Sequence, residues 1–176
     1  MTDARPLYLR DPQAYHAMLE EGNRTQARKR VSVDLLIRDE MGRVLLVQPS
    51  YKPGWDMPGG MVEANEPLRE AGAREVREEL GLQVQPGPML CVAWAAPHGP
   101  WDDLLAFVFD GGILAAGQAQ QIRLEEDGEL DQFEFCPLPA AVSRLDTRTA
   151  RRLEAAAAAL TGLVTYLEGS DSREIG

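Results

Sequence analysis

The chain has 176 residues, of which 28 are acidic and 18 are basic, so its formal net charge is −10. Hydrophobic residues make up 44 % and charged residues 26 %, which is typical of globular domains and excludes a wholly disordered or fibrous chain. This length predicts one domain, since domains usually have roughly 100–200 residues. A nucleic-acid polymer is not expected as a partner, because phosphate backbones bind to basic surfaces.

The cysteines and the hydropathy pattern suggest where the protein works. Cys91 and Cys136 lie far apart and form no C-x-x-C motif, so we expect two reduced, buried thiols. The N-terminus lacks the pattern of a signal peptide. No apolar run approaches the ~20 residues that a membrane span needs. We therefore expect a cytoplasmic protein without a membrane partner.

Residues 1–30 are expected to form an N-terminal extension with a short helix from Asp11 to Glu21. Asp11 is the predicted N-cap, and Pro12 suits the first helical position. The basic run 28–30 is interpreted as a solvent-exposed connector. The main domain is predicted over residues 31–168, and residues 169–176 are predicted to be a flexible tail.

The middle of the chain is predicted to be rich in strands. Apolar and β-branched residues at 31–38 and 43–48 flank the turn 39–42, which predicts a hairpin. The proline-rich segment 49–58 predicts an irregular loop, and a short extended piece is expected at 61–63. Further strands are predicted at 83–95, 104–109, 121–125 and 130–135, before a long alanine-rich helix at 147–167. Strands interrupted and followed by helices indicate an α+β or mixed α/β sandwich.

Residues 65–80 predict a helix in the middle of this strand-rich region. Asn65 or Glu66 is the expected N-cap, and Pro67 belongs to the first turn. Gly81 suits the left-handed position that ends a helix.

This helix carries a cluster of carboxylates that we call the acidic triad: Glu75, Glu78 and Glu79. At about 100° per residue the three side chains fall within roughly a 100° arc. Like charges at this spacing repel one another and raise their own pKa values. A hard divalent cation such as Mg²⁺, which prefers carboxylate oxygens, would relieve the repulsion. The alternative is a solvated acidic face paired with the arginines at 69, 74 and 77.

The segment from Gly60 to Leu82 resembles the signature of the Nudix hydrolase family. Glu66 and the run Arg74-Glu75-Val76-Arg77-Glu78-Glu79-Leu80-Gly81-Leu82 match its fixed positions, with aliphatic residues at 76 and 82. The resemblance covers 23 residues and implies an α/β/α sandwich around a mixed sheet. It also implies an enzyme that cleaves a diphosphate bond in a nucleoside diphosphate linked to another group, such as a nucleoside triphosphate, ADP-ribose or a nucleotide-sugar.

The resemblance also implies roles for single residues. The acidic triad and the backbone carbonyl of Gly60 would hold Mg²⁺, or Mn²⁺ in its place. Arg74 would position a glutamate of the site by a charge-assisted hydrogen bond. Glu66 would tie the preceding loop to the helix.

Chemistry at a diphosphate requires a group that takes a proton from the attacking water. Bound metal neutralises the diphosphate charge and lowers the pKa of that water, and a glutamate then acts as the general base. Glu75 and Glu78 are both candidates, and we favour the helix as the source of the base. A later loop is the alternative source, with candidates Asp102, Asp103, Glu125, Glu126 and Glu129.

The substrate-binding candidates lie in two loops. Tyr51 and Trp55 precede the Pro-Gly-Gly at 58–60, where an aromatic ring could stack on a base or simply pack the loop. His98 and Asp102 lie in the proline-rich loop around Trp101, and His98 could donate a hydrogen bond to a phosphate.

Two other hypotheses remain open. A hydrolase of a non-nucleotide diphosphate, such as an isoprenoid diphosphate, would need an apolar pocket around Trp55 and Trp101. A nucleotide-sensing module would bind without cleaving, although such modules usually lack some signature carboxylates. A homodimer, with the N-terminal segment reaching across to the second copy, is compatible with either.

Overall fold

The computed structural model describes residues 5–124 and 128–169 of the chain. Within them lies a seven-stranded sheet with the order β6-β2-β1-β5-β4-β7, and β3 pairs with β1 outside this path. Strand β1 is antiparallel to β2 and β3 but parallel to β5, so the sheet is mixed, as predicted. The strands are β1 (Arg30–Asp39), β2 (Val44–Pro49), β3 (Gly59–Met61), β4 (Met89–Ala95), β5 (Leu104–Leu114), β6 (Leu130–Cys136) and β7 (Thr165–Gly169).

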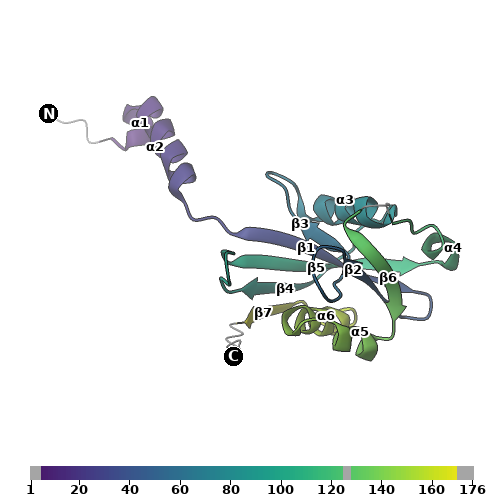
Figure 1. Cartoon of the computed structure of the whole chain (residues 1–176). Coiled ribbons are helices and arrows are strands. Elements are labelled where there is room, and N and C mark those ends of the chain that lie inside the picture. Colours follow the sequence, from purple (N-terminus) through teal and green to yellow (C-terminus); the bar gives the residue numbers. More distant parts are fainter. Residues whose placement is uncertain (1–4, 125–127, 170–176) are drawn as a thin grey trace.

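Helices cover both faces of the sheet, which gives the predicted α/β/α sandwich (Figure 1). On one face, Val76 and Leu80 of α3 (Leu68–Leu80) pack in a core with Val33 and Leu35 of β1. On the other face, α5 (Leu138–Arg144) and α6 (Thr147–Ala159) enclose a second core, which contains Leu36 of β1. Strand β1 is therefore buried on both faces, which explains its nearly continuous apolar sequence.

The predicted hairpin is confirmed, and a side chain fixes its turn. Asp39 Oδ1 accepts hydrogen bonds from the backbone N–H groups of Met41 (3.0 Å) and Arg43 (2.8 Å). Its Oδ2 accepts one from Nε of Arg43 at 2.6 Å. Gly42 occupies the left-handed region with φ 74°, which glycine adopts without strain.

The signature helix begins three residues later than predicted. Pro67, in an extended conformation, is the N-cap of α3, and Leu68 is the first helical residue. Asn65 is left-handed with φ 63° and belongs to the preceding turn. Glu66 does not cap the helix, because its carboxylate binds Arg74 and the N–H of Glu63. The predicted C-terminal end is confirmed, with Gly81 left-handed at φ 67°.

Three predicted strands or extended segments need correction. Strand β4 starts only at Met89, because the prolines at 86 and 88 cannot donate to a sheet ladder. The short extended piece is the strand Gly59–Met61 rather than 61–63. No strand is present over 121–124, which follow the short helix α4 (Ala116–Ala119), while Glu125 lies outside the described residues.

The C-terminal helix was predicted too long. It ends at Ala159, and the chain returns as β7, which pairs in parallel with β4. The helix α5 was not predicted. Gly169, the first residue of the expected tail, closes β7, and the rest of that tail lies outside the described residues.

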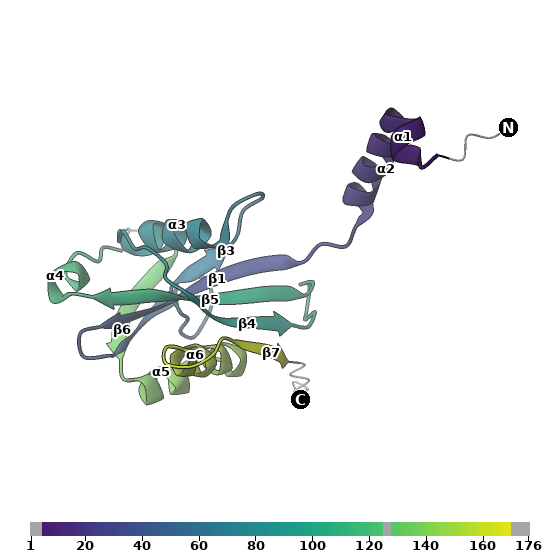
Figure 2. The ribbon, with the colours of Figure 1, turned by 180° about the vertical axis from the view of Figure 1, so that it is seen from behind.

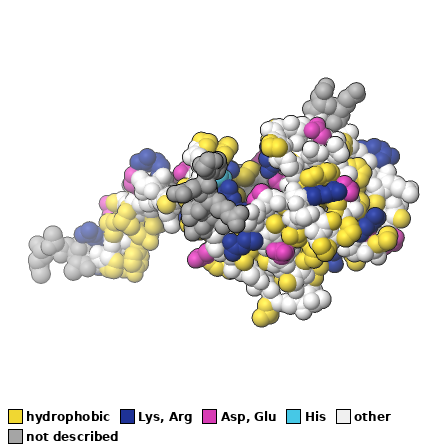
Figure 3. All heavy atoms as spheres, turned by 60° about the horizontal axis from the view of Figure 1, so that its bottom comes forward, with side chains coloured by type: hydrophobic (Ala, Val, Ile, Leu, Met, Phe, Trp, Pro, Cys, Tyr) yellow, Lys and Arg dark blue, Asp and Glu magenta, His cyan; other side chains and the backbone are white. Residues whose placement is uncertain are grey.

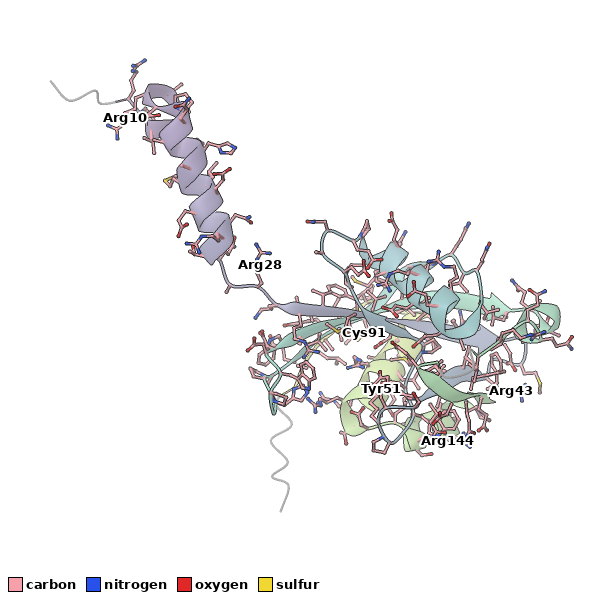
Figure 4. The ribbon with its side chains drawn as sticks, turned by 45° about the horizontal axis from the view of Figure 1, so that its top comes forward. Arg10, Arg28, Arg43, Tyr51, Cys91 and Arg144 are labelled. Carbon is pink, nitrogen blue, oxygen red and sulfur yellow. The ribbon has the colours of Figure 1, made fainter. Side chains whose placement is uncertain are left out.

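The N-terminal arm (residues 7–25) projects away from the sandwich in both views of the ribbon (Figures 1 and 2). It consists of α1 (Leu7–Arg10) and α2 (Pro12–Thr25), and neither helix has a buried residue. The predicted cap is confirmed, since Asp11 Oδ1 accepts a hydrogen bond from the N–H of Ala14 at 2.9 Å. Arg10 lies on the arm far from the sheet, and Arg28 lies on the connector that leads into β1 (Figure 4).

The connector is less free than the sequence suggested. Lys29 forms an ion pair with Asp103, and Arg30 begins β1 with its guanidinium 4.4 Å from the ring centre of Trp101. None of the helices among the described residues is both long and apolar enough to span a bilayer.

Candidate active site

Two glycines bring the loop before α3 against the signature helix. Strand β3 pairs with β1 through Gly59 opposite Asp34 and Gly60 opposite Val33. A Cβ on Gly59 (φ 143°) would lie 2.1 Å from the carbonyl oxygen of Val33. A Cβ on Gly60 would lie 2.5 Å from the carboxyl carbon of Glu75. Only glycine permits this approach, so the backbone around Gly60 lies directly against a carboxylate of the acidic triad.

Arg74 organises the outer part of the site. Its Nε and Nη2 donate to the two carboxylate oxygens of Glu66 at 2.8 and 3.0 Å. Its Nη1 donates to Glu75 at 2.9 Å and to Glu78 at 3.1 Å. Nη2 also donates to the carbonyl of Met61 at 3.1 Å. One guanidinium therefore joins the loop before α3 to two members of the acidic triad.

Glu66 and Glu75, which both contact Arg74, have pKa values that are shifted in opposite directions. The hydrogen bond from Arg74 and that from the N–H of Glu63 lower the pKa of Glu66 to about 2. Burial raises the pKa of Glu75, although its contacts with Arg74 oppose the shift. Glu66 is thus a permanent anion that anchors Arg74, while Glu75 is a half-buried carboxylate with raised proton affinity.

Glu79 is the most strongly perturbed member of the acidic triad. Burial raises the pKa of its carboxyl to about 8, and the charges of Glu75, Asp34 and Asp56 add to the shift. The N–H of Gly59 donates to Glu79 Oε2 at 3.0 Å and partly opposes it. A buried carboxylate among other carboxylates is stabilised by a bound cation.

The donor chemistry of the acidic triad suits a hard divalent cation, because all its donors are oxygens. The three side chains do not converge on one point, however. Arg74 holds Glu75 and Glu78, and Gly59 holds Glu79. Within residues 5–124 and 128–169, no group of three or more acidic, histidine or cysteine side chains is gathered as a metal site. The cation ligands inferred from the resemblance therefore remain a proposal.

A cleft of about 490 Å³ adjoins the acidic triad. Gly60 and Glu79 line it, whereas Glu75 and Glu78 do not. Of the predicted substrate-binding residues, Tyr51 and His98 line the cleft, and Trp101 does so as well. The other lining residues include Arg30, Ser32, Asp34, Val47, Lys52, Asp56, Met57, Asp146, Arg148, Thr149 and Arg152.

Trp55 and Asp102 are absent from the cleft lining. Trp55 is half-buried, with the guanidinium of Arg144 5.3 Å from its ring centre, and packs against the second core. Asp102 is exposed on the loop before β5. The role in loop packing that the sequence left open for Trp55 agrees with this position.

The floor of the cleft is polar, and sequence reasoning did not find it. Asp34 projects from β1, and Nη2 of Arg152 in α6 lies 3.2 Å from its Oδ2. Arg152 Nη2 also donates to Thr149 Oγ1 at 3.2 Å, and Thr149 donates to Asp146 Oδ2 at 2.7 Å. Burial raises the pKa of Asp34 to about 6, while the charge of Arg152 opposes the shift. We call Asp34, Arg152, Thr149 and Asp146 the polar floor.

A signal for this floor was present in the sequence. Asp34 is a carboxylate within the apolar run that predicts β1, and acidic side chains are almost never fully buried unless paired. The partner could not be identified, since Arg152 comes from a helix near the other end of the chain.

The loop carboxylates that are candidates for the general base differ in their partners and in their relation to the acidic triad. Asp103 accepts hydrogen bonds from Lys29 and from Nε1 of Trp94 (2.8 Å), which lower its pKa. Glu129 lies close enough to Glu75 for its charge to raise the pKa of Glu75. Glu125 and Glu126 lie outside the described residues. Of the three described candidates, Asp102, Asp103 and Glu129, it is therefore Glu129 that the structure relates to the acidic triad.

Comparison with known proteins shows which sequences and folds this chain resembles. The sequence profile of the NUDIX domain matches residues 28–157. The m7GpppN-mRNA hydrolase NUDT17 of Xenopus laevis is 31 % identical over 137 residues, which are 72 % of this chain and 44 % of that protein. The human 8-oxo-dGDP phosphatase NUDT18 is 34 % identical over 105 residues, 56 % of this chain and 29 % of that protein. This chain spans less than half the length of these curated relatives.

A solved structure matches over most of both chains. The MutT protein from Methanosarcina mazei Go1 superposes with a TM-score of 0.65 and 28 % identity. The match covers 77 % of this chain and 99 % of that one. The family profile begins at residue 28 and does not include the N-terminal arm.

Proposed function

This chain belongs to the Nudix family, and on that premise we propose that it is a Mg²⁺-dependent hydrolase. Its substrate is proposed to be a nucleoside diphosphate linked to another group, cleaved within the diphosphate. One observation carries the proposal: the cleft is lined both by Gly60 and Glu79 and by the polar floor. A charged phosphate chain and a polar group of one ligand would each find matching groups there.

The same observation argues against an isoprenoid diphosphate. A hydrocarbon chain on the polar floor would bury Asp34 and Arg152 without giving either a hydrogen-bond partner, which is costly. A sensing module that does not cleave is also less favoured, because every carboxylate of the signature is present. The names of the relatives mention an mRNA cap and an oxidised nucleoside diphosphate. Both kinds of molecule contain the proposed linkage and belong in a substrate screen.

The chain's own residues divide the work. Glu75, Glu78, Glu79 and the carbonyl of Gly60 would hold the cation, which when bound neutralises phosphate charge and lowers the pKa of water. Arg74 positions Glu75 and Glu78 from one guanidinium. Glu75 is our first candidate for the group that accepts the proton of the attacking water, because it is half-buried and its pKa is raised. Tyr51, His98 and Trp101 line the cleft where the remainder of the substrate would bind.

We propose a cytoplasmic location and a small-molecule substrate. A net charge of −10 disfavours binding along a nucleic-acid polymer. An RNA end, which presents only a diphosphate linkage to the site, does not require such a surface.

The test is a product screen by mass spectrometry with Mg²⁺. The panel contains nucleoside triphosphates, 8-oxo-dGDP, ADP-ribose, nucleotide-sugars, capped RNA and isoprenoid diphosphates. The parent is expected to release a nucleoside monophosphate, or the matching diphosphate-cleavage product, from at least one nucleotide. Glu79→Gln is expected to lose this activity by at least about 100-fold, since it removes a carboxylate from the proposed metal site.

A metal-binding measurement accompanies the screen. Titration with Mn²⁺, followed by electron paramagnetic resonance, is expected to show weaker binding to Glu79→Gln than to the parent. Equal binding and equal rates in the two proteins would contradict the metal assignment. Cleavage of isoprenoid diphosphates alone would replace the nucleotide proposal with the isoprenoid one.

A further inference from the structure

The polar floor contains a buried hydrogen-bond acceptor without a donor. The side chain of Asp34 is 9 % exposed and lines the cleft. Among the described residues, its Oδ2 has no hydrogen-bond partner, although the guanidinium of Arg152 lies beside it. Buried polar atoms in folded proteins nearly always have a partner, supplied by the protein, by water or by a ligand. The missing donor is therefore one that enters the cleft.

The cations around Asp34 also contact other groups. Arg152 Nη2 donates to Thr149, which in turn donates to Asp146 at the start of α6. Lys52 donates to Asp56 at 2.6 Å on the loop after β2. Among the described residues, the buried Nε of Arg152 has no hydrogen-bond partner either, so the ion pair at 3.2 Å leaves both Asp34 and Arg152 incompletely paired.

The chemistry of the acceptor restricts the group that fits. An ionised carboxylate only accepts hydrogen bonds. It therefore attracts an N–H or O–H donor, and it repels a carbonyl oxygen in the same place. Among nucleobases, adenine, cytosine and guanine carry an exocyclic amino group, whereas uracil and hypoxanthine carry a carbonyl or a hydrogen at the corresponding position.

We propose that Asp34 sets the substrate specificity of this cleft by accepting a hydrogen bond from the exocyclic amino group of a nucleobase. The proposal rests on the proposed function, because it assigns another part of the same substrate. Asp34 is a specificity-determining residue in this account, and Arg152 positions its carboxylate. The preferred substrates are then nucleotides of amino-bearing bases.

Matched nucleotide pairs test the proposal without any mutation. Cytidine and uridine differ by an amino group and a carbonyl, as do adenosine and inosine, while guanosine and inosine differ by one amino group. The affinities of the nucleoside monophosphates are measured by titration at pH 8, and kcat/KM of the triphosphates is measured with Mg²⁺. At least one pair is expected to favour the amino-bearing member by about tenfold or more, because a buried acceptor discriminates strongly against a ligand that leaves it unpaired.

Asp34→Asn then identifies the residue responsible. Its side-chain amide can donate as well as accept, so the amino preference is expected to fall to within about threefold or to reverse. Asp110→Asn is the matched control, because Asp110 is also partly buried and paired with an arginine, Arg38 at 2.7 Å, but does not line the cleft. The control is expected to keep the preference of the parent.

The outcomes separate this proposal from the proposed function. Hydrolysis of nucleotides with no amino preference in any pair overturns the role of Asp34 and leaves the hydrolase standing. Amino-selective binding that Asp34→Asn abolishes, without hydrolysis of any pair member or of any nucleotide in the substrate panel, supports the role of Asp34 and overturns the hydrolase. If the protein shows neither hydrolysis nor amino-selective binding, both the role of Asp34 and the hydrolase are overturned. A preference that survives in a folded Asp34→Asn protein also overturns the role of Asp34.

Discussion

Two kinds of contact define this site at the scale of single residues: a backbone that lies against a carboxylate, and one guanidinium that contacts several carboxylates. Gly60 lies against the carboxylate of Glu75, and Arg74 contacts two members of the acidic triad as well as Glu66. Removing any one of these side chains would leave others partly unpaired. Substitutions in this group are therefore expected to be strongly non-additive.

Single substitutions can identify the general base. We expect Glu75→Gln to lower kcat by about 10²–10⁴-fold, the usual cost of removing a general base. Glu78→Gln is expected to cost less by this route, since Glu78 is exposed, whereas the carboxylate of Glu75 lies against Gly60, which lines the cleft. Rates are measured at saturating Mg²⁺, with Mn²⁺ titration of each variant to detect loss of metal binding.

Glu129→Gln is the comparison for the loop. If Glu75→Gln and Glu78→Gln each lose only a few-fold in rate while Glu129→Gln loses 100-fold or more, the base comes from the loop before β6. Such a result would contradict our preference for the signature helix.

At the scale of elements, the hairpin β1–β2 is held by one carboxylate in its turn. Asp39→Asn is expected to reduce the free energy of unfolding at pH 7 by about 1–2 kcal/mol, because it removes the charge that Arg43 pairs with. Urea unfolding of both proteins measures the difference. Asp102→Asn, an exposed aspartate outside the hairpin, is expected to change stability by less than ~0.5 kcal/mol.

The pH dependence of this difference has a definite sign. Burial alone would raise the pKa of Asp39, but the hydrogen bonds and charge of Arg43 outweigh it and lower the pKa below the ordinary 3.8. The stabilisation is therefore fully present above pH 3.8 and disappears as the pH falls through the lower pKa of the folded state. The gap between parent and Asp39→Asn should shrink below pH 4, and a gap that grows there would contradict this account.

Elements with local signals could be predicted from the sequence. The hairpin, the cap of α2 at Asp11 and the end of α3 at Gly81 each follow from a few neighbouring residues. The start of α3 was misplaced because Asn65, a good capping residue, is left-handed in the preceding turn, while Glu66 binds Arg74. Competition between a local and a tertiary partner decided that boundary.

Elements that depend on distant partners could not be predicted. The segment Thr165–Gly169 is a strand because it pairs with β4, far away in the sequence, and the alanine run before it suggested a longer helix. The site divides in the same way. The acidic triad follows from spacing along one helix, whereas the polar floor joins β1 to α6 and appears only once the sandwich is formed.

At the scale of the whole molecule, the sandwich and the N-terminal arm are structurally separate. The two helices of the arm bury no residue, and hydrophobic side chains gather on its surface (Figure 3). Tyr8, Leu9, Met18 and Leu19 are each at least half exposed. An isolated helix of this length is only marginally stable in water, so the arm adds little to the stability of the sandwich.

Deletion of residues 1–26 tests this separation. The truncated protein keeps Lys29 with its partner Asp103 and the whole of β1. Its Tm is expected to lie within about 2 °C of the parent's, because changes to surface groups without buried contacts are worth about 0.5 kcal/mol or less.

Thermal unfolding is measured for both proteins at two concentrations tenfold apart, together with sedimentation velocity. A homodimer held by the arm, which stays a prediction from the sequence, would make the parent's Tm rise with concentration while the truncated protein's Tm stays constant. A large drop in Tm that is independent of concentration would instead mean that the arm packs on its own sandwich, contrary to the structure.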